Sequence, residues 1–196
     1  MFQPTPRSTR SSSTSQRVPW AAARRLIAPL AGALAMAFAS TAMAAPPTDA
    51  QILGIYIQVN GFDIETALLG RTQGQAAAVR ALGEHVSRDH IGVRHAAFEL
   101  AAKCGLTPEL PAARHAAARE HSATVARLQT LQGMAFDEAY LKHEVAFHQA
   151  AIGAVREVLL PSARCEALKT HLQTVLPAFE HHLAQSRTLA EAAPSR

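Results

Sequence analysis

Three histidines stand at positions that the apolar pattern of this 196-residue chain assigns to a buried helix face. They are His90, His148 and His182, and each lies on a different predicted helix. A neutral imidazole is a common metal ligand, so three imidazoles in one core could hold a transition-metal ion. The alternative is a buried polar network, in which each imidazole is hydrogen-bonded to a carboxylate or to a tyrosine and fixes the register of the helices.

Oxygen donors accompany these histidines. On the predicted helix of His148, spacings of three, four and four residues place two carboxylates and a phenol on the same face as the imidazole. A further carboxylate comes from the first predicted helix, and Asp89 stands beside His90. Carboxylates and histidines that project inward from facing helices hold the ions of di-metal bundles. The candidate metal ligands are therefore His90, His148, His182, Asp63, Asp137, Tyr140 and Glu144.

Two features favour the polar network over a single metal site. Di-metal bundles carry Glu-x-x-His motifs, whereas Glu144 and His148 are four residues apart. The expected levels along the bundle also differ, because His90 lies 14 residues before Cys104, His148 lies 11 before Leu159, and His182 lies 20 beyond Ser162. At about 1.5 Å per residue, His182 is expected roughly 10 Å from the level of the other two histidines.

The remaining histidines fall mostly off the apolar stripes, and we expect them on solvated faces. They are His85, His95, His115, His121, His143, His171 and His181. The chain also has no GxGxxG, GxxxxGK[ST], HExxH, CxxC or GxSxG motif, so no catalytic residue and no nucleotide cofactor are assigned. A transition-metal ion is the one cofactor that the residues leave open.

The elements that position these side chains are predicted helices, because apolar residues recur at helical spacing and Ala is abundant. Gly70 and Gly74 bracket a turn, Pro108 lies in a linker, and Pro161 ends a long helix. Pro177 is expected to kink the last helix without ending it. The predicted helices cover about 48–69, 79–104, 112–131 (a weaker helix), 136–159 and, with Ser162 as a possible cap, 162–189.

The connection between the second and third long helices predicts the topology. It runs from Gly105 to about Ala135, which is far longer than an antiparallel hairpin needs. We therefore expect an all-α, ferritin-like four-helix bundle with a long crossover that carries a short extra helix. This crossover brings Cys104 and Cys165 to the same end of the bundle, so a disulfide between them is expected in an exported protein. Two unpaired thiols are the alternative.

Charge and composition divide the chain near residue 44. Residues 1–44 carry five Arg and no Asp or Glu, whereas the remainder holds 14 Lys or Arg and 15 Asp or Glu. The basic start, the apolar run 26–38 and the Ala42-Met43-Ala44 site predict a signal peptide over 1–44, followed by one domain over 45–196. The apolar run is too short for a convincing membrane span, and no basic cluster for nucleic acid appears after residue 44.

Three ordered segments of the chain resemble a bacterial exported family, the domain of unknown function 4142, often called predicted outer membrane protein. They are residues 81–90, which end in Asp89-His90, residues 133–141 together with His148, and residues 176–183. The resemblance covers about residues 50–190 and implies a ferritin-like bundle. The family's pattern falls on Asp63, Asp89, His90, Phe136, Asp137, Tyr140, His148, Pro177 and His182. The chain departs from it at Phe147, where the family often has an acidic residue beside the third-helix histidine.

Three functions remain open from the sequence. The leading one is an exported, periplasmic bundle that acts in binding or in the cell envelope without turnover and that leaves room for a metal ion. The second is a metal-dependent redox enzyme, with an iron- or manganese-like centre that uses Tyr140 and the histidines. The third is an interaction module that binds another envelope protein or associates with a membrane surface. Export by the general secretory route is expected, although Arg24-Arg25 partly matches a twin-arginine signal.

Overall fold

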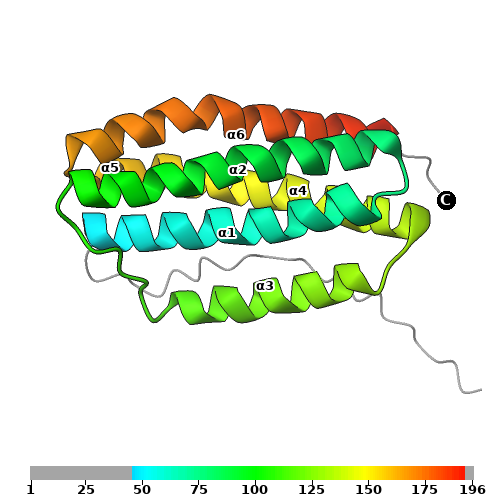
Figure 1. Cartoon of the computed structure of the whole chain (residues 1–196), viewed down its shortest axis with the longest axis horizontal. Helices are drawn as coiled ribbons and strands as arrows, with labels where there is room; N and C mark the ends of the chain where they lie inside the picture. Colours follow the sequence, from blue (N-terminus) through cyan, green and yellow to red (C-terminus); the bar gives the residue numbers. More distant parts are fainter. Residues whose placement is uncertain (1–45, 193–196) are drawn as a thin grey trace, which may run out of the picture. The chain divides into compact units, whose positions relative to one another are not determined.

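A computed structural model describes residues 46–192, and the predicted signal peptide with its cleavage site lies outside the described residues. These residues contain helices and no strand, which confirms the all-α prediction. Four long helices form the bundle: α1 (Asp49–Gln73), α2 (Ala77–Lys103), α4 (Gly133–Ala154) and α6 (Glu166–Ala192). The shorter helix α3 (Arg114–Gln129) contacts α1 and α4 (Figure 1).

The order of the helices follows the predicted crossover. The helices α1 and α2 are antiparallel neighbours joined by a short turn, and they share the most extensive contact in the bundle. The chain then returns along the bundle through α3, so that α2 and α4 run in the same direction (Figure 1). This is the one-crossover connectivity of ferritin-like bundles, with the extra helix on the crossover as expected.

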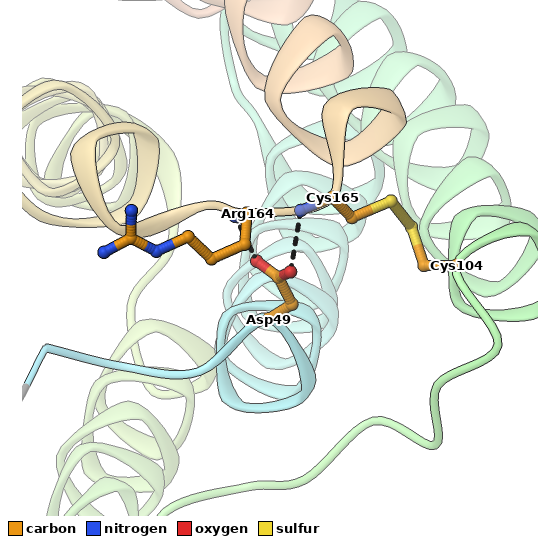
Figure 2. The surroundings of a disulfide bond; sticks show 4 residues. All are labelled: Asp49, Cys104, Arg164 and Cys165. Carbon is orange, nitrogen blue, oxygen red and sulfur yellow. Dashed lines mark hydrogen bonds between the residues drawn. A yellow bond between two sulfur atoms is a disulfide. The ribbon is translucent and has the colours of Figure 1, made fainter.

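The crossover brings the two cysteines together. Cys104, which follows α2, and Cys165, which precedes α6, form a disulfide with a Cα–Cα distance of 6.2 Å (Figure 2). Beside it, the Asp49 carboxylate accepts hydrogen bonds from the backbone N–H groups of Arg164 and Cys165 at 2.8 and 2.7 Å. The start of α1 therefore caps the start of α6. An acidic group is favoured there because a helix N-terminus has unpaired N–H groups and a partial positive charge.

Several helix ends differ from the prediction. The first helix runs on to Gln73, and the long helix begins at Gly133 rather than near Phe136. The long helix also passes into a π-helical segment, η1 (Val155–Leu159), and a last turn, α5 (Leu160–Ser162). Ser162 therefore ends this element instead of capping the next one, and α6 begins four residues later at Glu166. The last helix continues through Pro177, as predicted.

The core consists of two apolar clusters separated along the bundle. One lies at the disulfide end and includes Ile52, Ala97, Ile152 and Phe179. The other includes Ala67, Val86 and Leu141. On each of the four long helices, the residues between these two sets include a buried polar side chain. The bundle thus contains a buried polar layer between two apolar ones.

None of the helices within residues 46–192 combines the length and the apolar character that crossing a bilayer requires.

Candidate metal centre

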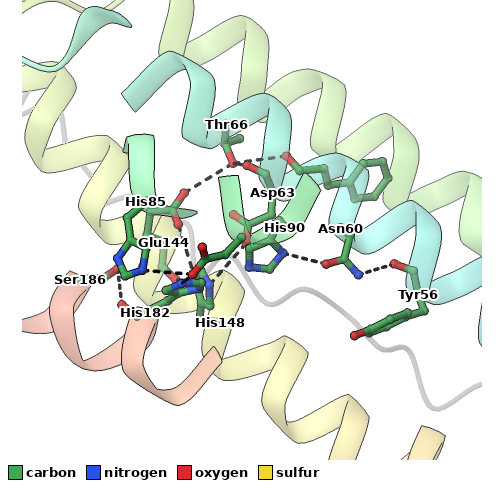
Figure 3. Close-up of polar contacts among 12 residues, drawn as sticks. Tyr56, Asn60, Asp63, Thr66, His85, His90, Glu144, His148, His182 and Ser186 are labelled. Atoms are coloured by element: carbon green, nitrogen blue, oxygen red, sulfur yellow. Dashed lines mark hydrogen bonds and ion pairs between the residues drawn. The ribbon is translucent and has the colours of Figure 1, made fainter. Parts of the chain in front are cut away.

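The buried polar layer is formed by one or two side chains from each long helix (Figure 3). Asp63 comes from α1, His90 from α2, Glu144 and His148 from α4, and His182 from α6. Their exposed fractions are 0, 2, 0, 0 and 1%. Charged and polar groups this deeply buried must be paired with one another or bind a ligand, because leaving them unpaired costs several kcal/mol. We call these five residues the polar layer.

The tautomer of His90 follows from its partner on α1. The Asn60 Nδ2 amide donates to the Tyr56 carbonyl at 2.7 Å, so the Asn60 Oδ1 atom is an acceptor. His90 Nδ1 lies 2.8 Å from this oxygen and donates its proton to it. In the neutral ring, His90 Nε2 then carries a lone pair. This nitrogen lies 3.0 Å from Asp63 Oδ2 but has no hydrogen-bond partner within the described residues.

His148 is held in the same way from its own helix. Its Nδ1 atom lies 3.0 Å from the backbone carbonyl of Glu144, which only accepts, so Nδ1 carries the proton. The His148 Nε2 atom is left with a lone pair that faces Asp63 Oδ2 at 3.4 Å. Like that of His90, it has no hydrogen-bond partner in residues 46–192.

His182 presents the opposite nitrogen to the polar layer. Its Nε2 atom lies 3.1 Å from Asp89 Oδ2 and donates to this carboxylate. Its Nδ1 atom is buried and has no hydrogen-bond partner among the described residues. All three imidazoles therefore have one nitrogen fixed by an acceptor and a second nitrogen that carries an unused lone pair.

The three imidazoles converge. One nitrogen each of His90, His148 and His182 lies within 4.8 Å of the other two, and the ring centroids are 5.3 to 5.6 Å apart. The expected offset of about 10 Å for His182 is therefore wrong. The helix ends explain the error: His90 lies 13 residues before Lys103, His148 lies 14 before Ser162, and His182 lies 16 after Glu166. Counted from these ends, the three levels nearly coincide.

The two carboxyl groups of the polar layer have opposite protonation tendencies. Burial would raise the pKa of Asp63, but the attraction of His90 and His148 outweighs burial and lowers the pKa below its ordinary range. Burial raises the pKa of Glu144 well above its ordinary value, and the neighbouring Asp63 charge raises it further. Asp63 therefore favours its ionised form, and Glu144 favours its protonated form.

Burial disfavours the protonated form of two of the three histidines. Burial lowers the pKa of His148, and burial together with His148 and His90 lowers the pKa of His182 to about 4. A proton on one imidazole would also satisfy only one of the three unused nitrogens. A cation bound among these nitrogens and Asp63 would satisfy all of them and neutralise the buried carboxylate.

Tyr140 belongs to the surroundings of the polar layer. Its side chain is fully buried, and its hydroxyl has no hydrogen-bond partner within the described part of the chain. Burial raises the pKa of this phenol, with Glu144 and Asp63 adding to the effect, so the phenol stays protonated. The ring fits because α1 has Gly70 here, where an added Cβ would lie 2.3 Å from the ring.

Asp137 does not join the polar layer, although the sequence placed it among the candidate ligands. Its two carboxylate oxygens accept from the backbone N–H groups of Gln75 and Ala76, both at 2.8 Å. These N–H groups precede α2, whose N-cap residue Ala76 offers no side-chain cap of its own. Asp137 therefore caps α2 from the neighbouring helix, and its oxygens are already occupied.

Sequence reasoning missed several residues around the polar layer. Asn60, the acceptor for His90, is 1% exposed and was not singled out, although it is a polar residue within an apolar helix. His143 and His121 were expected on solvated faces, yet they are only 4 and 9% exposed. Burial lowers the pKa of His143 to about 4, and His121 contacts Glu65 at 2.8 Å. Helical spacing alone could not reveal these two, because their burial depends on the packing of α3 against α1 and α4.

Comparison with known proteins gives one match. The family described as domain of unknown function (DUF4142) matches residues 33–189, in agreement with the resemblance seen in the sequence. No curated protein and no solved structure matches the chain. The chemistry of the site must therefore be argued from its own atoms.

Proposed function

The chain belongs to the DUF4142 family, whose function is unknown, and we propose that it binds one first-row transition-metal ion in its polar layer. His90, His148 and His182 supply the nitrogen ligands, and Asp63 supplies a carboxylate oxygen. Glu144 is a further oxygen ligand once it has lost its proton. In this proposal the protein is a metal-binding component of the exported compartment, and its two apolar clusters keep water from the ion.

One observation carries the proposal. Three buried imidazoles from three helices each have one nitrogen without a hydrogen-bond partner, and one nitrogen of each lies within 4.8 Å of the others, while the second nitrogen of each ring is held by an acceptor. Ligating histidines are usually oriented in this way, with the distal nitrogen donating to a carbonyl or a carboxylate. A polar network without an ion would instead pair these nitrogens with donors or, where an imidazole is protonated, with Asp63, which lies 3.0 Å from His90 Nε2. Within the described residues no donor reaches them.

The ligand types select the class of metal. Imidazole nitrogens suit Zn²⁺, Cu²⁺, Fe²⁺ and Ni²⁺, whereas Mg²⁺ and Ca²⁺ prefer sites made of oxygen alone. A set of three nitrogens and one carboxylate follows the usual order of affinity, so Cu²⁺ and Zn²⁺ are expected to bind more tightly than Mn²⁺. Asp63 and Glu144 have hard oxygen atoms, which keep Fe²⁺ among the possible ions.

Burial favours binding over turnover. Asp63, Glu144 and His148 have no exposed surface, so a substrate larger than a small molecule such as dioxygen or peroxide does not reach the ion without movement of the helices. A metal store, buffer or carrier needs only the ion to reach the site. The disulfide fits an oxidising, exported location such as the periplasm.

A redox enzyme is the second candidate, and Tyr140 is the residue that favours it. This phenol is buried next to the polar layer, where a redox-active ion could exchange electrons with it. We expect a Tyr140→Phe variant to keep its metal content under both functions. If the iron-loaded wild type consumes peroxide and the iron-loaded variant does not, the redox enzyme becomes the better supported function.

Elemental analysis tests the proposal. Protein exported to the periplasm of an expression host is purified without a metal-affinity tag or chelator, and its metal content is compared with that of a His90→Ala/His148→Ala variant. We expect about one ion per chain in the wild type and less than a tenth of that in the variant. His95→Ala is a matched control, because His95 lies exposed on α2 and contacts only Glu99 among the described acidic groups.

A second measurement guards against a variant that fails to fold. Metal-free wild-type protein is titrated with Zn²⁺, Cu²⁺, Fe²⁺ and Mn²⁺ while its melting temperature is followed, because a ligand that binds only the folded state stabilises it. A rise of several degrees with at least one ion is expected. Wild-type protein that carries no metal and shows no rise with any of the four would overturn the proposal and leave the buried polar network.

A further inference from the structure

We infer that a second group of residues, His85 and Asp89 with His182, captures the metal ion from solvent and passes it to the polar layer through His182. This inference rests on the proposed function, because it assigns the route to that same site. The three residues are called the outer group below. They lie on α2 and α6.

The outer group has the composition and spacing of a weak metal site. His85 Nε2 and His182 Nε2 each lie 3.1 Å from the same atom, Asp89 Oδ2. One ligand atom from each of the three residues lies within 4.8 Å of the others. The ring of His181 lies nearby, with its centroid 5.9 Å from that of His85. Two imidazoles and one carboxylate are ligands that a divalent transition-metal ion accepts.

Exposure distinguishes the outer group from the polar layer. The side chains of His85 and Asp89 are 32 and 33% exposed, so a hydrated ion reaches them directly. The side chains of Asp63, His90 and His148 are 0 to 3% exposed. An ion in solvent therefore meets the outer group first, and the Asp89 carboxylate attracts cations against the opposing charge of Arg88, which lies 3.6 Å from it.

His182 is the link between the two groups. Among the described residues, it is the one side chain that belongs both to the outer group and to the triad with His90 and His148. Its Nε2 atom lies 3.1 Å from Asp89 Oδ2, and its Nδ1 atom is buried and has no hydrogen-bond partner among the described residues. One ring thus offers a nitrogen to each site, and the ring centroids of His85 and His90 lie 5.1 and 5.4 Å from it.

The chemistry of imidazole makes the transfer an exchange of ion and proton. A neutral ring binds metal through the nitrogen that lacks a proton. In the outer group, His182 binds through Nε2 and carries its proton on Nδ1. In the polar layer it binds through Nδ1, and the proton moves to Nε2, where Asp89 accepts the hydrogen bond seen here. The net charge of the ring does not change, and no redox partner is needed.

A purely structural role for Asp89 is the competing explanation. In that case Asp89 orients His182 through the hydrogen bond to Nε2, and His85 contributes nothing to metal binding. The two explanations differ in what His85 does. They also differ in the quantity that changes. Loss of a group on the route slows metal uptake and metal release by the same factor, whereas loss of a group that only orients a ligand changes the affinity for the metal.

Rapid-mixing measurements with Co²⁺ test the inference, since bound Co²⁺ gives visible absorption bands. The metal-free full protein is mixed with sub-stoichiometric Co²⁺, and the loaded protein is later mixed with excess chelator. In His85→Ala we expect uptake and release to slow by the same factor of at least 10, with the final occupancy unchanged. His95→Ala is the matched control, because His95 also contacts an acidic residue four positions later on α2, and it should load at the wild-type rate.

Asp89→Asn serves as a second variant. Its amide oxygen still accepts from His182, but it removes the charge that attracts the ion, so uptake should slow and should lose part of its dependence on salt. Wild-type rates in His85→Ala would overturn the inference, and so would a loss of occupancy in that variant. A wild-type protein that never binds Co²⁺, Zn²⁺, Cu²⁺, Fe²⁺ or Mn²⁺ would overturn the proposed function itself, which keeps the two failures distinct.

Discussion

At the scale of single residues, the polar layer depends on groups that lie outside it. Asn60 is the clearest case, because its carboxamide is anchored to the Tyr56 carbonyl and fixes the His90 tautomer. Without this acceptor, the His90 ring can place its proton on either nitrogen and can rotate. The orientation of a ligand is therefore built into the helix that faces it.

Replacement of Asn60 by Leu should weaken metal binding while leaving one site per chain. We expect the dissociation constant, measured by competition with a chromophoric chelator, to rise by about 10- to 100-fold. Asn60→Asp keeps an acceptor for His90 and is the control that should retain most of the affinity. An unchanged dissociation constant in Asn60→Leu would mean that packing alone orients His90.

The metal-free protein should lose stability as the pH falls from about 6.5 to about 4. The pKa of His143 is lowered by burial to about 4, so the unfolded chain binds this proton at a higher pH than the folded chain does. Stability therefore rises with pH across this window, and His143 alone accounts for about 3 kcal/mol at its acidic end. His148 and His182 act in the same direction, and Glu144, whose pKa is raised, offsets part of the effect.

Urea unfolding of the metal-free protein at pH 7.5, 6 and 5 measures this dependence. A His143→Phe variant should show a flatter profile than the wild type, because it removes one of the protons taken up on unfolding. An equally steep profile in the variant would assign the dependence to the other buried histidines.

At the scale of the helices, the close approach of α1 and α2 sets the distance between Asp63 and His90. A Cβ added at Gly83 would lie 2.3 Å from the backbone nitrogen of Arg71, so α1 and α2 would have to move apart to make room for it. At Gly92, on the same helix, an added Cβ meets nothing within 4 Å. The two glycines therefore allow a matched comparison.

Gly83→Ala should lower the free energy of unfolding by about 1–3 kcal/mol through overpacking. Gly92→Ala should raise it by about 0.5–1 kcal/mol, because Ala is the better helix former. Urea unfolding of both variants at neutral pH measures these two changes in the free energy of unfolding. Similar changes in the two would show that α1 and α2 move apart at little cost.

Asp137 stabilises the start of α2 and is not one of the proposed metal ligands. Asp137→Ala removes both acceptors for the N–H groups that precede α2, and we expect a loss of about 1–2 kcal/mol in unfolding free energy. The metal content of the purified variant should equal that of the wild type. A variant that folds but loses its ion would return Asp137 to the ligand set.

At the scale of the whole molecule, the disulfide joins the two ends of the crossover. The Cys104–Cys165 bond spans 61 positions, so its loss frees a long loop in the unfolded chain. We expect a Cys104→Ser/Cys165→Ser variant to lose about 4 kcal/mol of stability by the chain-entropy estimate. Metal binding should persist, because an apolar cluster separates the disulfide from the polar layer.

Denaturant unfolding checks the disulfide prediction, together with a thiol titration of the denatured, unreduced wild type. The titration should find no free thiol. Two free thiols would show that the bond does not form in the exported protein, whatever the distance between the two cysteines.

The amino-acid sequence by itself determined the fold class, the crossover and the pairing of the cysteines. These follow from local signals, namely helical spacing of apolar residues, the positions of Gly and Pro, and the length of the connection between two long helices. The burial of His90, His148 and His182 was also predictable, because each lies on an apolar stripe. The family match agrees with this part of the prediction.

Only the tertiary structure decided which polar groups meet and in which protonation state. The level of His182 depends on where α6 begins, and a shift of four residues moves a side chain by about 6 Å along a helix. The acceptor for His90 lies 30 residues away on another helix, and Asp137 is bound by N–H groups about 60 residues away. Lone-pair directions and desolvation arise from such distant contacts, so helical spacing alone does not contain them.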